Sequence, residues 1–422
     1  MAPFVLLAVF GAALSPVAAQ FPPWQQSWRM SDSSIAMPCN FSGYTEPSSV
    51  AGWSITSFDW SNSLYAWSAA TPMDTDERNL AQVALSKAAN PAQKVWIYRN
   101  SVYGYPWYYE VRALLDDPEY RPWFIMFNNQ SGPSFSPMCD VNYSPPLCTD
   151  YFHTQMDTPQ IPGKSGYGTC APPACNCGTK PCGFYVFNHS SDVVIRGQSF
   201  QQWFINSFML SAVGSSPLVS GFFWDDFWHV DGDMGDNTPH AITDMGLTPA
   251  DLQQLTASYD ANMAALRASI LAAGKFSWQM LWTGGAADAV GSTCPQPLVQ
   301  KATCAADLRA LCSASSPAQT NRTLMYAFSP GGCSHVNPDA LPDLVNDLAN
   351  FLLVRGPFAY LGTAWVGCSR KYFYPPQLAV DYGVPSGLCA ETAPGSGIFS
   401  RDFSASIISM DCNAWNATIT MK

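Results

Sequence analysis

Residues 221–229, Gly-Phe-Phe-Trp-Asp-Asp-Phe-Trp-His, join a short apolar run to two adjacent aspartates. An apolar run of this length is typical of a parallel strand that is buried on both faces. In parallel α/β sheets and barrels, ligand sites form at the carboxyl ends of the strands. The stretch therefore predicts a buried parallel strand that ends at a functional site, with Asp225 or Asp226 facing that site because adjacent strand residues alternate sides.

The same kind of run recurs along the chain and predicts the fold class. The other candidate strands are residues 55–60, 94–100, 184–189, 276–282, 323–328, 358–365 and 397–403. Helical spacing fills most of the gaps between them, at residues 77–89, 106–115, 200–212, 249–273, 298–312 and 341–354. Eight alternating strands favour a closed (β/α)8 barrel of the TIM type over a doubly wound α/β sheet. We expect residues 20–422 to form this single domain, with a C-terminal β extension.

A Cys-rich insertion, residues 116–183, interrupts the alternation. The chain holds 14 cysteines, and the densest cluster is Cys170, Cys175, Cys177 and Cys182. An even number of cysteines predicts disulfides in an oxidising compartment. Zinc is the alternative for the cluster, but its spacing departs from paired Cys-x-x-Cys. We therefore predict a disulfide-rich insertion and no metal site.

Residues 1–19 have the pattern of a secretory signal peptide. An apolar stretch from Phe4 to Leu14 precedes small residues at Val17 and Ala19, with cleavage expected before Gln20. Six N-glycosylation sequons begin at Asn40, Asn129, Asn142, Asn188, Asn321 and Asn416. No other run is long enough for a membrane span. The sequence predicts a secreted, extracellular glycoprotein (or one held in the lumen of the secretory pathway).

The composition restricts the class of partner. The net charge is −11 and only 12% of residues are charged, whereas 14% are aromatic. Such a chain lacks the basic surface that nucleic acids or anionic membranes require. Aromatic faces stack on sugar rings, and neutral polar groups bind their hydroxyls. We expect a carbohydrate partner, neither nucleic acid nor membrane. No cofactor is expected, and a phosphate-binding glycine loop is absent. The chain also lacks the G-x-S-x-G motif of a serine nucleophile.

Polar and aromatic residues near the predicted strand ends are the candidate substrate-binding groups. They are Asp59, Trp60, Tyr98, Arg99, Asn100, His189, Trp224, Trp228, His229, Gln279 and Trp282. Taken singly, each is as readily a structural residue.

Glycoside hydrolysis usually requires two carboxyl groups. Close carboxylates shift each other's pKa, so that one stays protonated while the other is ionised. Asp225 and Asp226 are the predicted catalytic residues, and the further carboxyl group is Asp59 or an aspartate of the loop 231–236. The alternatives to a catalytic role for this acidic loop are a solvated surface loop and a calcium site.

Several segments resemble a set of secreted proteins predicted from unicellular algae. They include VWIYRN (95–100), VSGFFWDDFW (219–228), FSWQML (276–281), LANFLLVRGPFAYLGTAWVGC (348–368) and the C-terminal run from Leu388. That set is similar to hypothetical glycosyl-hydrolase-like (β/α)8 barrel families. The resemblance implies that Asp225 and Asp226 match a strand-end active centre and that residues 401–403 belong to a closing strand.

The sequence thus predicts a secreted glycoside hydrolase that acts on a neutral or weakly charged poly- or oligosaccharide. The alternatives are a catalytically inactive, lectin-like barrel, which would use the same aromatic residues, and a disulfide-linked structural protein of the cell covering.

Overall fold

The computed structural model describes residues 27–127, 139–140, 147–154, 183–229, 245–279, 299–316, 319, 324–327, 344–363 and 374–422. Several predictions lie outside the described residues. They concern the signal peptide, the Cys170–Cys182 cluster, the loop 231–236, Trp282, and the sequons at Asn129, Asn142 and Asn321.

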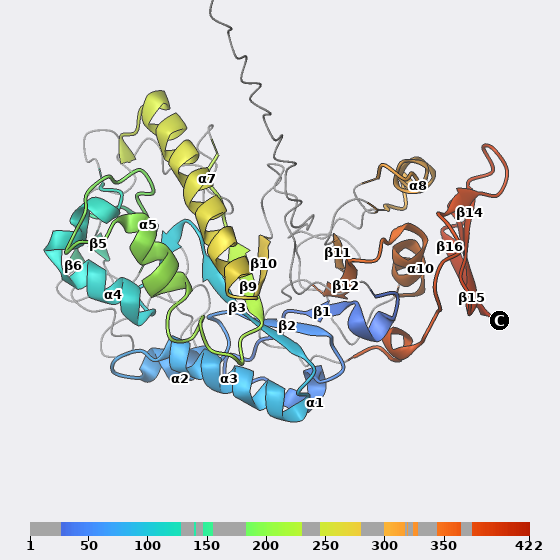
Figure 1. Cartoon of the computed structure of the whole chain (residues 1–422), viewed down its shortest axis with the longest axis horizontal. Helices are drawn as coiled ribbons and strands as arrows, with labels where there is room; N and C mark the ends of the chain where they lie inside the picture. Colours follow the sequence, from blue (N-terminus) through green and yellow to red (C-terminus); the bar gives the residue numbers. More distant parts are fainter. Residues whose placement is uncertain are drawn as a thin grey trace, which may run out of the picture.

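A seven-stranded parallel sheet forms the centre of the molecule (Figure 1). Its order is β10-β9-β3-β2-β1-β12-β11. The strands are β1 (Ser34–Ala36), β2 (Ile55–Phe58), β3 (Lys94–Asn100), β9 (Gly221–Asp225), β10 (Phe276–Gln279), β11 (Leu324–Ala327) and β12 (Ala359–Thr363).

The strand order is that of a barrel and not of a doubly wound sheet. Within this sheet, β1, β2, β3, β9 and β10 follow one another in chain order, each paired with the one before it. β12 returns to pair with β1. A doubly wound sheet would instead reverse direction at a switch point. Within the described residues no pairing joins β10 to β11, so the sheet is a curled half-barrel there. The predicted α/β fold with parallel strands is confirmed, whereas a closed eight-stranded barrel is not shown.

Two predicted barrel strands belong to other sheets, and one strand was missed. β8 (Phe184–Val186) lies between β4 (Tyr103–Gly104) and β7 (His153–Thr154) in an antiparallel sheet. β14 (Ile398–Asp402) lies in the C-terminal antiparallel sheet, so residues 401–403 do not close the central sheet. β1 has only three residues, too few for a periodic signal.

The two faces of the central sheet have different surroundings. Register places Ser57, Trp96 and Gly221 on one face, here called the inner face, and Tyr98 with Phe223 share it. Trp278 packs there against Phe223, with ring centroids 5.0 Å apart. A Cβ atom on Gly221 would lie 2.9 Å from the Trp96 indole nitrogen, so glycine makes room for this ring.

The opposite, outer face of β2 and β3 is covered by helices (Figure 1). Each segment with predicted helical spacing contains a helix. The longer ones are α3 (Thr75–Ala89), α4 (Tyr109–Asp116), α7 (Pro249–Ala272), α8 (Cys304–Leu311) and α10 (Leu344–Val354), and α5 (Phe200–Trp203) continues as a π-helix over Phe204–Met209. The shorter elements are α1 (Pro47–Val50), α2 (Leu64–Ala69), β5 (Cys139–Asp140), β6 (Leu147–Cys148) and 3-10 turns at Met30–Asp32, Pro118–Trp123 and Pro376–Ala379.

A four-stranded antiparallel sheet forms the predicted C-terminal extension, at the opposite end of the molecule from α4 and α5 (Figure 1). Its other strands are β13 (Ala390–Glu391), β15 (Ser406–Asp411) and β16 (Asn416–Met421). Disulfides Cys304–Cys412 and Cys312–Cys389 tie both ends of α8 to this sheet. In the described part of the chain, no helix is long and apolar enough to cross a membrane.

Candidate active site

Asp225 and Asp226 lie at the carboxyl end of β9, as predicted, but in different conformations. Asp225 is the last strand residue, pairs with Asn100 and is half-buried. Asp226 has a left-handed backbone with φ of 58° and is 3% exposed. Its amide donates to Asp225 Oδ1 at 3.0 Å. The strand alternation ends here, so the two carboxyl groups do not point to opposite faces as they would in a continuing strand.

Two side chains of β3 hold these carboxylates. Tyr98 Oη donates to Asp225 Oδ2 at 2.9 Å, and Asn100 Nδ2 donates to Asp226 Oδ2. Tyr98 and Asn100 are two residues apart and therefore share the inner face. Hydrogen bonds to a carboxylate stabilise its negative charge and fix its orientation.

Tyr105 completes the hydrogen-bond network. Its Oη lies 3.1 Å from Tyr98 Oη and 2.7 Å from Asn100 Nδ2. Because Tyr98 has one hydroxyl hydrogen and gives it to Asp225, Tyr105 donates to Tyr98. Asn100 Nδ2 also lies 3.0 Å from Tyr98 Oη, so its two amide hydrogens are shared among Tyr98, Tyr105 and Asp226. Burial is the largest cause that raises the pKa of both tyrosines well above the ordinary value, and the two aspartates add to it. Both phenols therefore stay protonated donors.

A second layer of polar groups supports the backbone of this strand end. Ser101 Oγ lies 2.9 Å from the Asp225 carbonyl and 2.8 Å from the Asp226 carbonyl. Tyr259 Oη, from α7, lies 2.8 Å from the same hydroxyl. The Ser101 carbonyl in turn lies 2.8 Å from His189 Nε2.

His189 is a structural residue of this support. A carbonyl can only accept, so His189 Nε2 carries the hydrogen, and Nδ1 accepts from Asn262 Nδ2 at 3.1 Å. Burial lowers the pKa of His189 to about 4. The imidazole is 4% exposed and neutral, and both of its nitrogens are used in this support, so its substrate contact stays a prediction.

Asp59 and Trp60 directly follow β2. Asp59 is half-buried, and Ser61 donates to its Oδ1 through its hydroxyl and, at 2.8 Å, through its amide. Burial raises the pKa of Asp59 to about 6, although the Ser61 bonds oppose this. The half-buried Trp60 ring lies 5.1 Å from the Trp107 ring, which stacks on Tyr105 at 4.6 Å. Trp60 is thus the partly exposed member of an aromatic cluster beside the network.

Arg99 and Trp224, both predicted substrate contacts, lie away from the network. Register pairs these residues with each other on the outer face. Arg99 is fully buried, pairs with Asp76 of α3 at 3.0 Å and lies over the Tyr108 ring. Trp224 Nε1 donates to Ser277 Oγ at 2.8 Å. Strand alternation turns both away from Tyr98 and Asn100.

The other predicted residues have varied positions. Trp228 is 1% exposed and packs in the hydrophobic core, so its substrate contact stays a prediction. His229 is exposed. Burial raises the pKa of Asp260, and Arg267 opposes this rise. The backbone of Gln279 ends β10 in register with Trp224. Among the described residues, no group of three His, Cys, Asp or Glu side chains could hold a metal ion.

Sequence reasoning missed Tyr105, Ser101, Tyr259 and Asn262. Tyr259 and Asn262 lie on the buried side of α7 with Met263. Polar side chains on an otherwise apolar helix stripe were the available signal for both. Tyr105 and Ser101 follow β3 in a loop, and no periodic pattern marks such positions.

No protein-family model and no curated protein matches the chain. Among solved structures, it is similar to the acarbose-soaked debranching enzyme of Nostoc punctiforme, with 12% identity, 93% of this chain and 90% of that chain covered, and a TM-score of 0.42. It is also similar to the ligand-free cyclic alpha-maltosyl-(1→6)-maltose hydrolase of Arthrobacter globiformis, with 9% identity, coverage of 95% and 97%, and a TM-score of 0.43. TM-scores below 0.5 denote a loose likeness.

Proposed function

We propose that the protein is a secreted glycoside hydrolase built on a closed (β/α)8 barrel, which acts on a neutral or weakly charged poly- or oligosaccharide. The observation that carries the proposal is the strand-end carboxylate Asp225, oriented on the inner face by Tyr98. It lies at the edge where parallel α/β folds place their ligand sites.

Asp225 is the better candidate of the two aspartates for direct contact with substrate. It is half-buried, so part of its surface is accessible, whereas Asp226 is 3% exposed. Glycosidic bond cleavage builds positive charge at the anomeric carbon. A fixed carboxylate next to that carbon stabilises this charge more than it stabilises the neutral substrate. Asp226 keeps Asn100 in place.

The charges near the site favour a neutral sugar. Asp59, Asp225 and Asp226 all lie at the carboxyl ends of β2 and β9. Arg99, the cation at the carboxyl end of the intervening strand, faces the opposite side and is paired with Asp76. A uronate or sulfated sugar would meet like charge here, whereas the Trp60 ring offers a stacking face for an uncharged one.

Secretion is supported by the disulfides Cys304–Cys412 and Cys312–Cys389, since such bonds persist in oxidising compartments. Cleavage after residue 19 and glycosylation of the sequons remain predictions, which mass analysis of the secreted protein tests directly.

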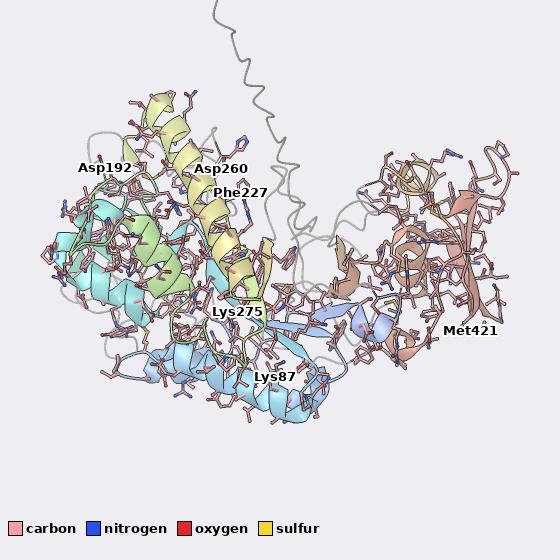
Figure 2. All side chains as sticks on the ribbon, viewed as in Figure 1. Lys87, Asp192, Phe227, Asp260, Lys275 and Met421 are labelled. Atoms are coloured by element: carbon pink, nitrogen blue, oxygen red, sulfur yellow. A yellow bond between two sulfur atoms is a disulfide. The ribbon has the colours of Figure 1, made fainter. Side chains whose placement is uncertain are left out.

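The test of the activity is a hydrolysis screen of the secreted protein on plant and algal polysaccharides and aryl glycosides. We expect the wild type to release reducing ends and Asp225→Asn to lose at least 100-fold of that rate, on the order of one carboxylate's catalytic contribution. The matched control is Asp192→Asn, because Asp192 is exposed and lies on the part of the molecule that carries α4 and α5 (Figure 2). Glycan binding without hydrolysis by the wild type would support the lectin-like alternative.

A further inference from the structure

The sheet register brings Asp59 to the inner face beside the network. Phe58 pairs with Ile97, so the next residue, Asp59, is level with Tyr98. Residues level with each other in adjacent parallel strands point to the same side. On the other side of β3, Tyr98 pairs with Phe223 and Asn100 pairs with Asp225. Asp59, Tyr98 and Asp225 therefore share one face, at the carboxyl ends of three consecutive strands.

The intervening strand separates the two carboxyl groups. β2 and β9 both pair with β3, one on each side, so their backbones are two strand spacings apart, about 9 to 10 Å. Tyr98 lies between them and donates to Asp225, not to Asp59. A sugar ring positioned over Tyr98 would have one carboxyl group on each side, the arrangement that glycoside cleavage uses.

The immediate surroundings of the two groups also differ. Asp225 accepts hydrogen bonds from Tyr98 and from the Asp226 amide, which stabilise a negative charge. Burial is the main influence on Asp59, and it raises the pKa of this carboxyl to about 6. The two groups therefore suit different tasks, Asp59 as a proton donor and Asp225 as the carboxylate whose position is fixed by hydrogen bonds.

We propose that Asp59 is the catalytic acid of the proposed hydrolase, acting across β3 from Asp225. Asp59 gives its proton to the glycosidic oxygen while the bond from that oxygen to the anomeric carbon breaks, and the bonding electron pair stays with the oxygen. The Asp225 carboxylate balances the charge on the anomeric carbon. A water molecule then adds to this carbon from the side opposite the leaving group and gives a proton to the Asp225 carboxylate, the course that widely separated carboxyl groups favour. Proton exchange with solvent restores both groups.

The inference rests on the proposed function. A comparison of two substrates with different leaving groups distinguishes a failure of the Asp59 assignment from a failure of the proposed function. The substrates are an oligosaccharide that the wild type cleaves and the 2,4-dinitrophenyl glycoside of the same sugar, whose leaving group needs no protonation. Because Asp59→Asn would create a glycosylation sequon with Ser61, the wild type and all variants are produced in an oxidising host that lacks N-glycosylation. We expect Asp59→Asn to lose on the order of 100- to 10,000-fold on the oligosaccharide. On the dinitrophenyl glycoside it should stay within about tenfold of the wild type. Asp225→Asn should lose activity on both substrates.

Two further variants complete the design. Asp59→Glu keeps a proton donor and should recover part of the oligosaccharide activity. Asp192→Asn should match the wild type on both substrates. If Asp59→Asn retains oligosaccharide activity, or loses both activities to the same extent, Asp59 is not the acid. If the wild type cleaves neither substrate, the proposed function itself fails. Activity of Asp59→Asn on the dinitrophenyl glycoside also shows that the variant is folded.

Discussion

At the residue scale, the left-handed backbone of Asp226 determines how the site is built. A φ of 58° ends the strand within one residue and turns the Asp226 carboxylate to Asn100. Aspartate tolerates this conformation better than most residues because its short polar side chain forms local hydrogen bonds. The turn therefore lets two adjacent aspartates reach one network, whereas a regular strand would put them on opposite faces.

Tyr98→Phe tests the orientation of Asp225. The change removes the donor to Asp225 Oδ2 and keeps the ring that packs against Phe223. A hydrogen bond to a charged group contributes about 1.5 to 3 kcal/mol, so kcat should fall about 10- to 100-fold with little change in KM. Steady-state kinetics measure both constants. Tyr109→Phe is the control, because Tyr109 is 62% exposed, and an equal effect of both changes would contradict the assignment.

His189 predicts a pH dependence of stability. Its pKa is about 4 in the folded protein and 6.5 as the ordinary value, so between these pH values the unfolded chain binds more protons. Stability is therefore fully present above pH 6.5 and is lost as the pH falls toward 4, by about 3 kcal/mol. The Asp59 pKa of about 6 acts in the opposite sense, since the folded state then binds the extra proton between pH 3.8 and 6.

The two contributions are separated by variants. In urea unfolding between pH 4 and 7, His189→Gln should flatten the loss of stability at low pH, because the amide still donates to Ser101 but does not titrate. Asp59→Asn should steepen it. An unchanged slope in His189→Gln would show that His189 is not the titrating group.

At the scale of elements, β3 shows both the reach and the limit of prediction from sequence. The run 94–100 predicts the strand correctly, and its polar end contributes side chains to the candidate site. Tyr98 and Asn100 face the network, whereas Arg99 between them faces α3. Strand alternation requires Tyr98 and Asn100 to face one side of the sheet and Arg99 the other. The sequence does not tell which side is the inner face, because both faces of β3 are buried and both carry apolar and polar residues.

The helix α8 is an element held at both ends. Cys304 begins it, Cys312 follows it, and Arg309 binds Glu391 of β13 through two hydrogen bonds of 3.0 and 2.7 Å. The bridge Cys312–Cys389 lies inside the loop that Cys304–Cys412 closes. In the unfolded chain, one intact bridge therefore shortens the loop that the other bridge closes.

This nesting predicts non-additive stability effects. Replacing one cysteine pair by alanine should cost about 3 to 4 kcal/mol of unfolding free energy, because the remaining bridge still limits the unfolded chain. Replacing both pairs should cost more than the sum of the two. Urea unfolding of the three variants and the wild type measures the coupling. Strictly additive losses of unfolding free energy would mean that the bridges do not act by restricting the unfolded chain.

At the scale of the whole molecule, the sequence predicts the α/β class and the site's edge of the sheet, but not the membership of every strand. The run at 184–189 is apolar like the barrel strands, yet its partners β4 and β7 are antiparallel. Only the tertiary partners distinguish these cases, because a short apolar run fits either sheet. The role of Tyr259 depends on α7 lying next to Ser101, more than 150 residues earlier.

The pairing of β1 with β12 has a consequence for biosynthesis. Ser34 lies opposite Leu361, and the buried Arg355 binds the Trp28 carbonyl and the Ser33 hydroxyl. During translation, Trp28, Ser33 and Ser34 are synthesised more than 300 residues before Arg355 and Leu361. The edge of β1 that pairs with β12 therefore stays open until residues 359–363 have been synthesised, more than 300 residues after β1. Until then this edge depends on other protection from aggregation.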